Sequence, residues 1–167
     1  EWAIAYSPNY AEAHNNLGLA LQEQKQFENA KKEFEMATSL NQNYAQAFHN
    51  LGILCEIINL PNEAIFSYEK TIEINKEFAE AYRNLCKLKK FKSKDPIITQ
   101  IKSLHSRDSH NLADKARLSF ALADINKNLG NTEQYFKYLN EGNQLRKEET
   151  NYSFEESKNF HSIITNL

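Results

Sequence analysis

The chain has 167 residues, 41% of them hydrophobic, which is enough for one domain with a sizeable core. Four glycines and three prolines are too few for a disordered chain or one rich in strands and turns. The net charge of −2 excludes a general nucleic-acid binder, and no apolar run reaches the roughly 20 residues that cross a bilayer.

The first ten residues align with two later ten-residue segments, Glu35–Tyr44 and Glu69–Phe78. We therefore expect residues 1–10 to be the end of a truncated upstream repeat, with Pro8 closing its second helix. Because the chain begins at Glu1, we expect it to be a fragment in which Trp2 lies at an uncapped end.

Residues 45–78 repeat residues 11–44 at a shift of 34 positions (45 − 11), and the match begins again at Ala79. Small residues recur where two helices must approach closely, and large residues recur where the gaps between them are filled. The matched sets are Ala11/Ala45/Ala79, Ala13/Ala47/Ala81, Asn16/Asn50/Asn84, Leu17/Leu51/Leu85, Gly18/Gly52, Ala30/Ala64 and Phe34/Tyr68. A period of this length predicts a helical solenoid.

This pattern resembles the tetratricopeptide repeat family, which implies an all-α, right-handed solenoid of antiparallel helix pairs. Residues 11–44 are then repeat 1, 45–78 repeat 2 and 79–110 a degenerate repeat 3. The predicted helices are Ala11–Gln24, Phe27–Leu40, Ala45–Ile57, Asn62–Ile74 and Ala79–Phe91.

The remainder of the chain is expected to form an atypical helical cap of the same domain, which would span 1–167. Asp95 and Pro96 predict the start of a short helix, Pro96–Leu104. A repeat-like hairpin over 111–147 follows, with helices Leu112–Leu129 and Thr132–Arg146. A capping box of Ser153 with Glu156 predicts a separate capping or linker helix, Ser153–Asn166, with an apolar stripe.

Residues 118–157 carry a second resemblance, to the junction that precedes the catalytic domain of bacterial tetratricopeptide–sulfotransferase proteins. The matching residues are Phe120-Ala121-Leu122, Gly130, Phe136, Leu139, Gly142-Asn143 and Leu145-Arg146. The resemblance implies a sulfotransferase domain after Leu167. The glycine-rich turn that would bind the sulfate donor is absent from the chain.

No catalytic site, metal site or cofactor site is predicted. Cys55 and Cys86 fall on apolar helix faces and are interpreted as buried thiols in a reducing compartment, by default the cytoplasm. His105 and His110 are interpreted as solvated loop histidines rather than metal ligands. His14 stands where later repeats have Phe48 and Tyr82, so it is interpreted as a packing residue.

One polar pattern suggests binding. Asn16, Asn50 and Asn84 recur once per repeat on first helices, which line the concave surface in this family. An asparagine amide can bond both the C=O and the N–H of an extended peptide. The row resembles the asparagine ladder of the O-linked N-acetylglucosamine transferase family, and His49 is counted with it. The alternative is that each asparagine bonds a neighbouring repeat.

Arg83, Lys87, Lys90 and Lys94 are spaced to form a basic stripe that could pair with an acidic ligand, or a solvated face. Because Asn15 and Leu19 replace the Lys and Asn of chaperone-binding repeats, a chaperone-tail clamp is not expected.

Three functions remain open. The first is a non-catalytic module that binds an extended, acidic peptide in its groove; replacing all three asparagines with alanine should then abolish binding and leave melting unchanged. The second is the substrate-presenting arm of a sulfotransferase, and the third is a spacer or dimerisation module acting through Trp2 and the last helix. The oligomeric state is not predicted.

Overall fold

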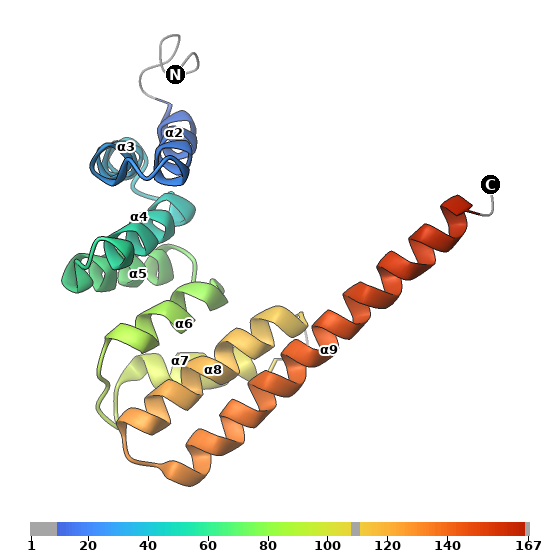
Figure 1. The fold of residues 1–167 in the computed structure, drawn as a ribbon. Helices are drawn as coiled ribbons and strands as arrows, with labels where there is room; N and C mark the ends of the chain where they lie inside the picture. Colours follow the sequence, from blue (N-terminus) through green and yellow to red (C-terminus); the bar gives the residue numbers. More distant parts are fainter. Residues whose placement is uncertain (1–9, 108–110, 166–167) are drawn as a thin grey trace. The chain divides into compact units, whose positions relative to one another are not determined.

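The computed structural model describes the backbone of residues 10–107 and 111–165, and side chains as far as residue 150. Over these ranges the chain forms eight helices and no strand (Figure 1). It divides into two compact units, residues 1–89 and residues 90–167. The predicted all-α class is confirmed. Pro8 and Trp2 lie outside the described residues.

Unit 1 is a stack of helix pairs in which each helix packs against the next along the chain. Its helices are α2 (Ala11–Glu23), α3 (Phe27–Leu40), α4 (Ala45–Ile57), α5 (Pro61–Ile74) and α6 (Ala79–Leu88). Each pair is joined by a tight turn that places Lys25 and its repeat equivalent Asn59 at a φ of 59°. This left-handed conformation ends the first helix and reverses the chain direction.

The repeated small and large residues meet each other inside each pair. Phe34 and Tyr68 are fully buried, on the second helices of repeats 1 and 2. A Cβ atom at Gly18 would lie 2.7 Å from the Phe34 ring, and one at Gly52 would lie 2.6 Å from the Tyr68 ring. Glycine at these two helix positions therefore allows the aromatic ring of the partner helix to lie against the backbone.

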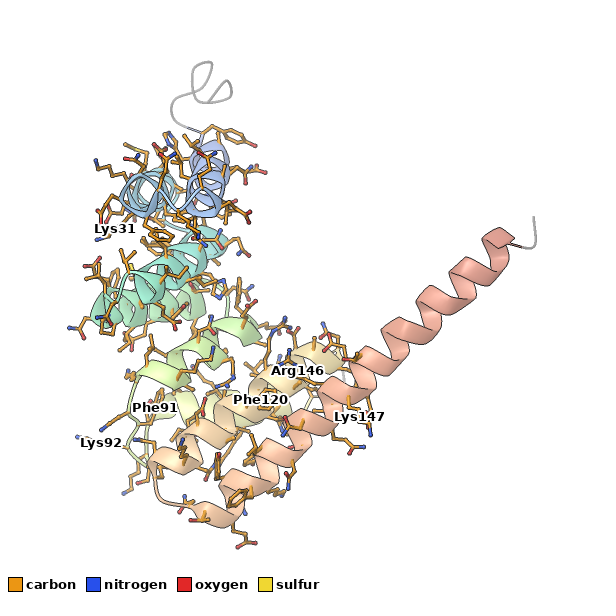
Figure 2. All side chains as sticks on the ribbon, in the orientation of Figure 1. Lys31, Phe91, Lys92, Phe120, Arg146 and Lys147 are labelled. Carbon is orange, nitrogen blue, oxygen red and sulfur yellow. The ribbon has the colours of Figure 1, made fainter. Side chains whose placement is uncertain are left out.

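Helix α6 ends at Leu88, so the predicted extension to Phe91 is wrong. Lys89 has extended backbone angles. Phe91, labelled in Figure 2, is buried in unit 2, and its backbone N–H donates to Asn128 Oδ1 at 3.0 Å. Because this N–H bonds a side chain of unit 2, it makes no helical bond.

Unit 2 contains α7 (Pro96–His105), α8 (Leu112–Asn128) and α9 (Thr132–Thr165). Asp95 caps α7, as predicted, by accepting a hydrogen bond from the N–H of Ile97 at 3.1 Å. Helices α8 and α9 form a hairpin that turns at Gly130, whose φ is +76°. A Cβ atom at Gly142 would lie 2.8 Å from the Phe120 ring, so these two helices pack closely there.

Helix α9 is continuous over 34 residues, so the predicted break between Arg146 and Ser153 is wrong. Residues 147–152 contain neither glycine nor proline, and helical backbone continues through them. Ser153 therefore lies inside a helix and cannot cap one. The predicted apolar stripe beyond it lies outside the side chains that the structure describes.

Candidate functional site

The first helices of repeats 1 and 2, α2 and α4, and the next helix of unit 1, α6, each carry exposed side chains along one side. We call these the first-helix face and define it by Glu12, Asn16 and Leu19 on α2, Gln46 and Ile57 on α4, and Glu80 and Lys87 on α6. All seven are exposed, and those on each helix are three, four, seven or eleven residues apart. Such spacing places residues on one side of a helix.

Asn50 lies beneath this face and connects repeat 2 to repeat 1. It is only 6% exposed, and its amide nitrogen donates to Asn15 Oδ1 at 2.8 Å. Its own Oδ1 accepts from Gln46 Nε2 at 2.9 Å. The buried asparagine therefore bonds a neighbouring repeat on one side and orients an exposed amide on the other.

Asn84 occupies the same place in the next pair. Its amide nitrogen donates to His49 Nε2 at 3.3 Å, and this ring nitrogen accepts because an amide nitrogen can only donate. Its Oδ1 accepts from Lys87 Nζ at 3.0 Å. His49 is 2% exposed and has ring contacts with Phe78 and Tyr68, at centroid distances of 4.7 and 5.7 Å. His49 is thus a packing residue below the surface.

Asn16 differs from its two equivalents because it is exposed. Of the two interpretations that the sequence left open, the bond to a neighbouring repeat describes the contacts of Asn50 and Asn84. The exposed side chains with N–H donors on the first-helix face are Asn16 itself, Gln46, which bonds Asn50, and Lys87, which bonds Asn84. Sequence reasoning missed Gln46, although its spacing of four residues from Asn50 on one helix was a signal for it.

The predicted basic stripe is interrupted. Arg83 and Lys87 lie on α6, the first half-buried and the second exposed. Lys90 and Lys94 are exposed but lie after the end of α6 at Leu88. Since no helix connects the two halves, spacings of three and four residues no longer place all four side chains on one face, and the prediction of a single stripe is wrong.

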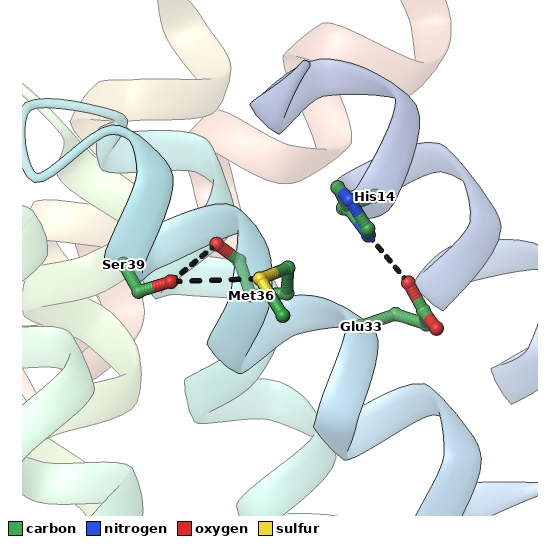
Figure 3. Close-up of polar contacts among 4 residues, drawn as sticks. All are labelled: His14, Glu33, Met36 and Ser39. Atoms are coloured by element: carbon green, nitrogen blue, oxygen red, sulfur yellow. Dashed lines mark hydrogen bonds and ion pairs between the residues drawn. The ribbon is translucent and has the colours of Figure 1, made fainter. Parts of the chain in front are cut away.

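The histidines with described side chains have structural partners. His14 is buried, and its Nδ1 lies 2.6 Å from Glu33 Oε2 on α3 (Figure 3). Figure 3 also shows the hydrogen bond that the Ser39 hydroxyl donates to the Met36 carbonyl within α3. This fits the prediction that His14 packs within its repeat.

His105 was predicted to be a solvated loop residue, and this is wrong. It lies at the end of α7, with its Nε2 2.9 Å from Ser119 Oγ and 3.3 Å from Glu141 Oε1. His110 lies outside the described residues. Within the described part of the chain, no group of three His, Cys, Asp or Glu side chains is arranged to hold a metal ion.

The shifted pKa values in the core of unit 1 follow from burial. Cys55 and Cys86 are buried, as predicted, and burial raises the pKa of Cys55 to about 11. Burial also raises the pKa of Tyr82 to about 12, and burial with a hydrogen bond to Glu56 raises the pKa of Tyr68. These groups therefore stay protonated at neutral pH, which suits packing rather than nucleophilic chemistry.

Comparison with known proteins identifies the class of unit 1. Residues 11–44 match a family model described as Tetratricopeptide repeat, and residues 45–78 match a second model with the same description. The chain therefore contains two tetratricopeptide repeats, at the positions where its sequence repeats itself. Residues 79–110 and 111–147 stay predicted repeats.

Solved structures of similar fold cover most of the chain. A crystal structure of MamA has 18% sequence identity and a TM-score of 0.63, and the match covers 90% of this chain and 86% of MamA. YrrB, titled a TPR protein with an unusual peptide-binding site, has 15% identity and a TM-score of 0.56, with 86% of each chain covered. PilF of Pseudomonas aeruginosa has 21% identity and a TM-score of 0.58, with 81% of this chain and 61% of PilF covered. These likenesses show the fold, and no curated protein matches the sequence.

Neither matching family model reaches residues 118–157, so the resemblance to a sulfotransferase junction has no support from them. Helix packing explains two of its residues, since Phe120 and Gly142 meet between α8 and α9. Among the described helices, none combines the length and apolar character needed to cross a membrane.

Proposed function

We propose that this chain is a non-catalytic protein–protein interaction module whose first-helix face binds an extended peptide. The observation that supports this best is that all three first helices present an exposed polar donor on this face. Asn16, Gln46 and Lys87 are exposed, one from each first helix, and each can donate a hydrogen bond to a peptide carbonyl. Asn16 and Gln46 can also accept one from a peptide N–H.

The buried asparagines contribute by holding the exposed groups in place. Asn50 accepts from Gln46 and Asn84 accepts from Lys87, so these two exposed donors are oriented before a peptide arrives. A side chain that is already ordered loses less rotamer entropy on binding. Leu19 and Ile57, 38% and 50% exposed, add apolar contacts for peptide side chains on the same face.

A preference for acidic peptides is part of this proposal and rests on Arg83 and Lys87. The same face also carries Glu12 on α2 and Glu80 in the first turn of α6, so the preference is confined to the last turn of α6, where Lys87 lies. A peptide with its acidic residues at one end would then bind in one direction only.

The test is selection from a phage-displayed library of random linear peptides on the immobilised chain, followed by affinity measurements on variants. Asn16→Ala, Gln46→Ala and Lys87→Ala should each weaken a selected peptide by about tenfold, and the triple variant should abolish its binding. Lys32→Ala, an exposed change on the second helix α3, is the matched control and should leave the affinity unchanged.

Unchanged binding in the triple variant would show that the first-helix face is not the peptide site. A selected peptide whose affinity does not fall when Lys87 becomes Glu would contradict the acidic preference alone.

A further inference from the structure

The opposite side of the helix stack carries a groove that the proposed function does not use. Helices α3 and α5 form its walls and α4 its floor, and it consists of two hollows of about 370 and 410 Å³. Both hollows are lined by Thr38, Phe48 and Phe66, so they adjoin each other. We call this the α3–α5 groove.

Phe66 is the side chain in this groove that the repeat architecture does not require. It is 56% exposed, and the equivalent position in repeat 1 (66 − 34) is the exposed residue Lys32. Because lysine fills the same position in a similar helix pair, packing of the repeat does not demand an aromatic ring there. An exposed phenylalanine between two hollows is instead the kind of residue that a bound partner covers.

The rim of the groove has a net negative charge. At one end Lys31, labelled in Figure 2, lies 2.6 Å from Glu63 and 3.7 Å from Glu35. At the other end Lys70 pairs with Glu73 at 2.8 Å. Three carboxylates therefore face two ammonium groups, and the excess charge favours a cationic partner.

The shape and chemistry of the groove favour a helical partner. Its α5 wall runs from Asn62 to Ile74, a span of roughly 18 Å at 1.5 Å per residue, which matches about three turns of helix. An extended strand would place its backbone N–H and C=O groups over Phe48, Leu51 and Phe66, where the helical walls offer no unpaired backbone to bond them. A helix satisfies its own backbone groups and presents only side chains.

We propose that the α3–α5 groove binds an amphipathic helix of about twelve residues from a partner protein. Leucine-sized side chains on one face of that helix fill the two hollows and cover Phe66. Lysine or arginine residues along its edges lie over Glu35, Glu63 and Glu73. This site is separate from the first-helix face, so one chain can hold two partners at once.

The test uses a fluorescein-labelled model peptide of leucine and lysine, fourteen residues long, with leucines at i, i+3/i+4 and i+7. Its binding to the full chain is followed by fluorescence anisotropy. Phe66→Lys, which installs the residue that repeat 1 carries, should weaken binding by about tenfold or more. The matched control is Phe136→Lys, since Phe136 on α9 is 53% exposed but lies in unit 2; it should bind as the unmodified chain does.

A second peptide with glutamate in place of lysine should bind much more weakly if the rim charge selects the partner. Equal binding by the Phe66→Lys variant, equal loss in the Phe136→Lys control, or no binding of the leucine–lysine peptide would each overturn the proposal. A dimer in sedimentation that dissociates in Phe66→Lys would assign the groove to a second copy of this chain instead. The triple variant of Asn16, Gln46 and Lys87 should keep full affinity for this peptide, which separates this test from that of the first-helix face.

Discussion

Replacing Asn50 with alanine should destabilise the chain, whereas the same change at Asn16 should not. The two residues occupy equivalent repeat positions on first helices, so the change in helix propensity is the same at both. They differ in burial, because Asn50 is 6% exposed and Asn16 is exposed. The comparison therefore isolates the contact between repeats.

The expected difference follows from what Asn50→Ala leaves behind. It removes the 2.8 Å bond to Asn15, and Asn15 is itself only 3% exposed. A buried acceptor without its donor costs about 1–3 kcal/mol, while an exposed substitution stays within about 0.5 kcal/mol. We expect Asn50→Ala to unfold with a free energy about 2 kcal/mol lower than Asn16→Ala.

Urea unfolding followed by circular dichroism at 222 nm measures this difference. With a slope of about 2 kcal/mol per molar, the midpoint of Asn50→Ala should lie about 1 M below that of Asn16→Ala. The double variant Asn15→Ala/Asn50→Ala should lose about 1 kcal/mol less than the sum of the two single variants, because it no longer contains the unpaired Asn15 oxygen. Equal midpoints for Asn16→Ala and Asn50→Ala would refute the reasoning. The earlier expectation that alanine replacements leave melting unchanged is thus restricted to Asn16.

Two further predictions concern the core of unit 1. In Gly52→Ala the new Cβ atom would meet the Tyr68 ring at 2.6 Å, which should lower the free energy of unfolding by about 1–3 kcal/mol. The higher helix propensity of alanine offsets up to about 1 kcal/mol of this loss. Urea unfolding should show a smaller loss in a Tyr68→Val background, and an equal loss would contradict the steric cause. Burial raises the pKa of Cys55 from 9.0 to about 11, so the folded state holds the thiol proton more tightly than the unfolded state. The protonated thiol therefore contributes its full share of the free energy of unfolding below pH 9, and this contribution should be lost as the pH rises toward 11. Urea midpoints across this range should fall less steeply for Cys55→Ala, and identical slopes would rule out a contribution from this thiol.

Local pattern was enough to predict most of the helices. The shift of 34 residues aligned Gly18 with Gly52 and Phe34 with Tyr68, and in each repeat the glycine lies against the aromatic ring. Caps were readable where one residue makes the contact, as with Asp95 at the start of α7. These features involve neighbours in sequence or within one helix pair, so their physical cause is present in a short segment.

Features that depend on distant residues were predicted incorrectly or left open. Helix α6 ends at Leu88, and the N–H of Phe91, which was predicted to be helical, instead bonds Asn128, 37 residues away; no local pattern reports such a partner. Ser153 and Glu156 have the spacing of a capping box, but Ser153 lies inside α9, because nothing before it interrupts the helix.

The repeated asparagines show most clearly which features the local sequence predicts and which depend on distant contacts. The sequence by itself determined that Asn16, Asn50 and Asn84 share one position on successive first helices. Only the tertiary structure decided that Asn50 reaches Asn15 and Asn84 reaches His49, while Asn16 stays exposed. A periodicity specifies the direction in which a side chain leaves its own helix, but the distance to the next repeat decides whether it meets solvent or a buried partner.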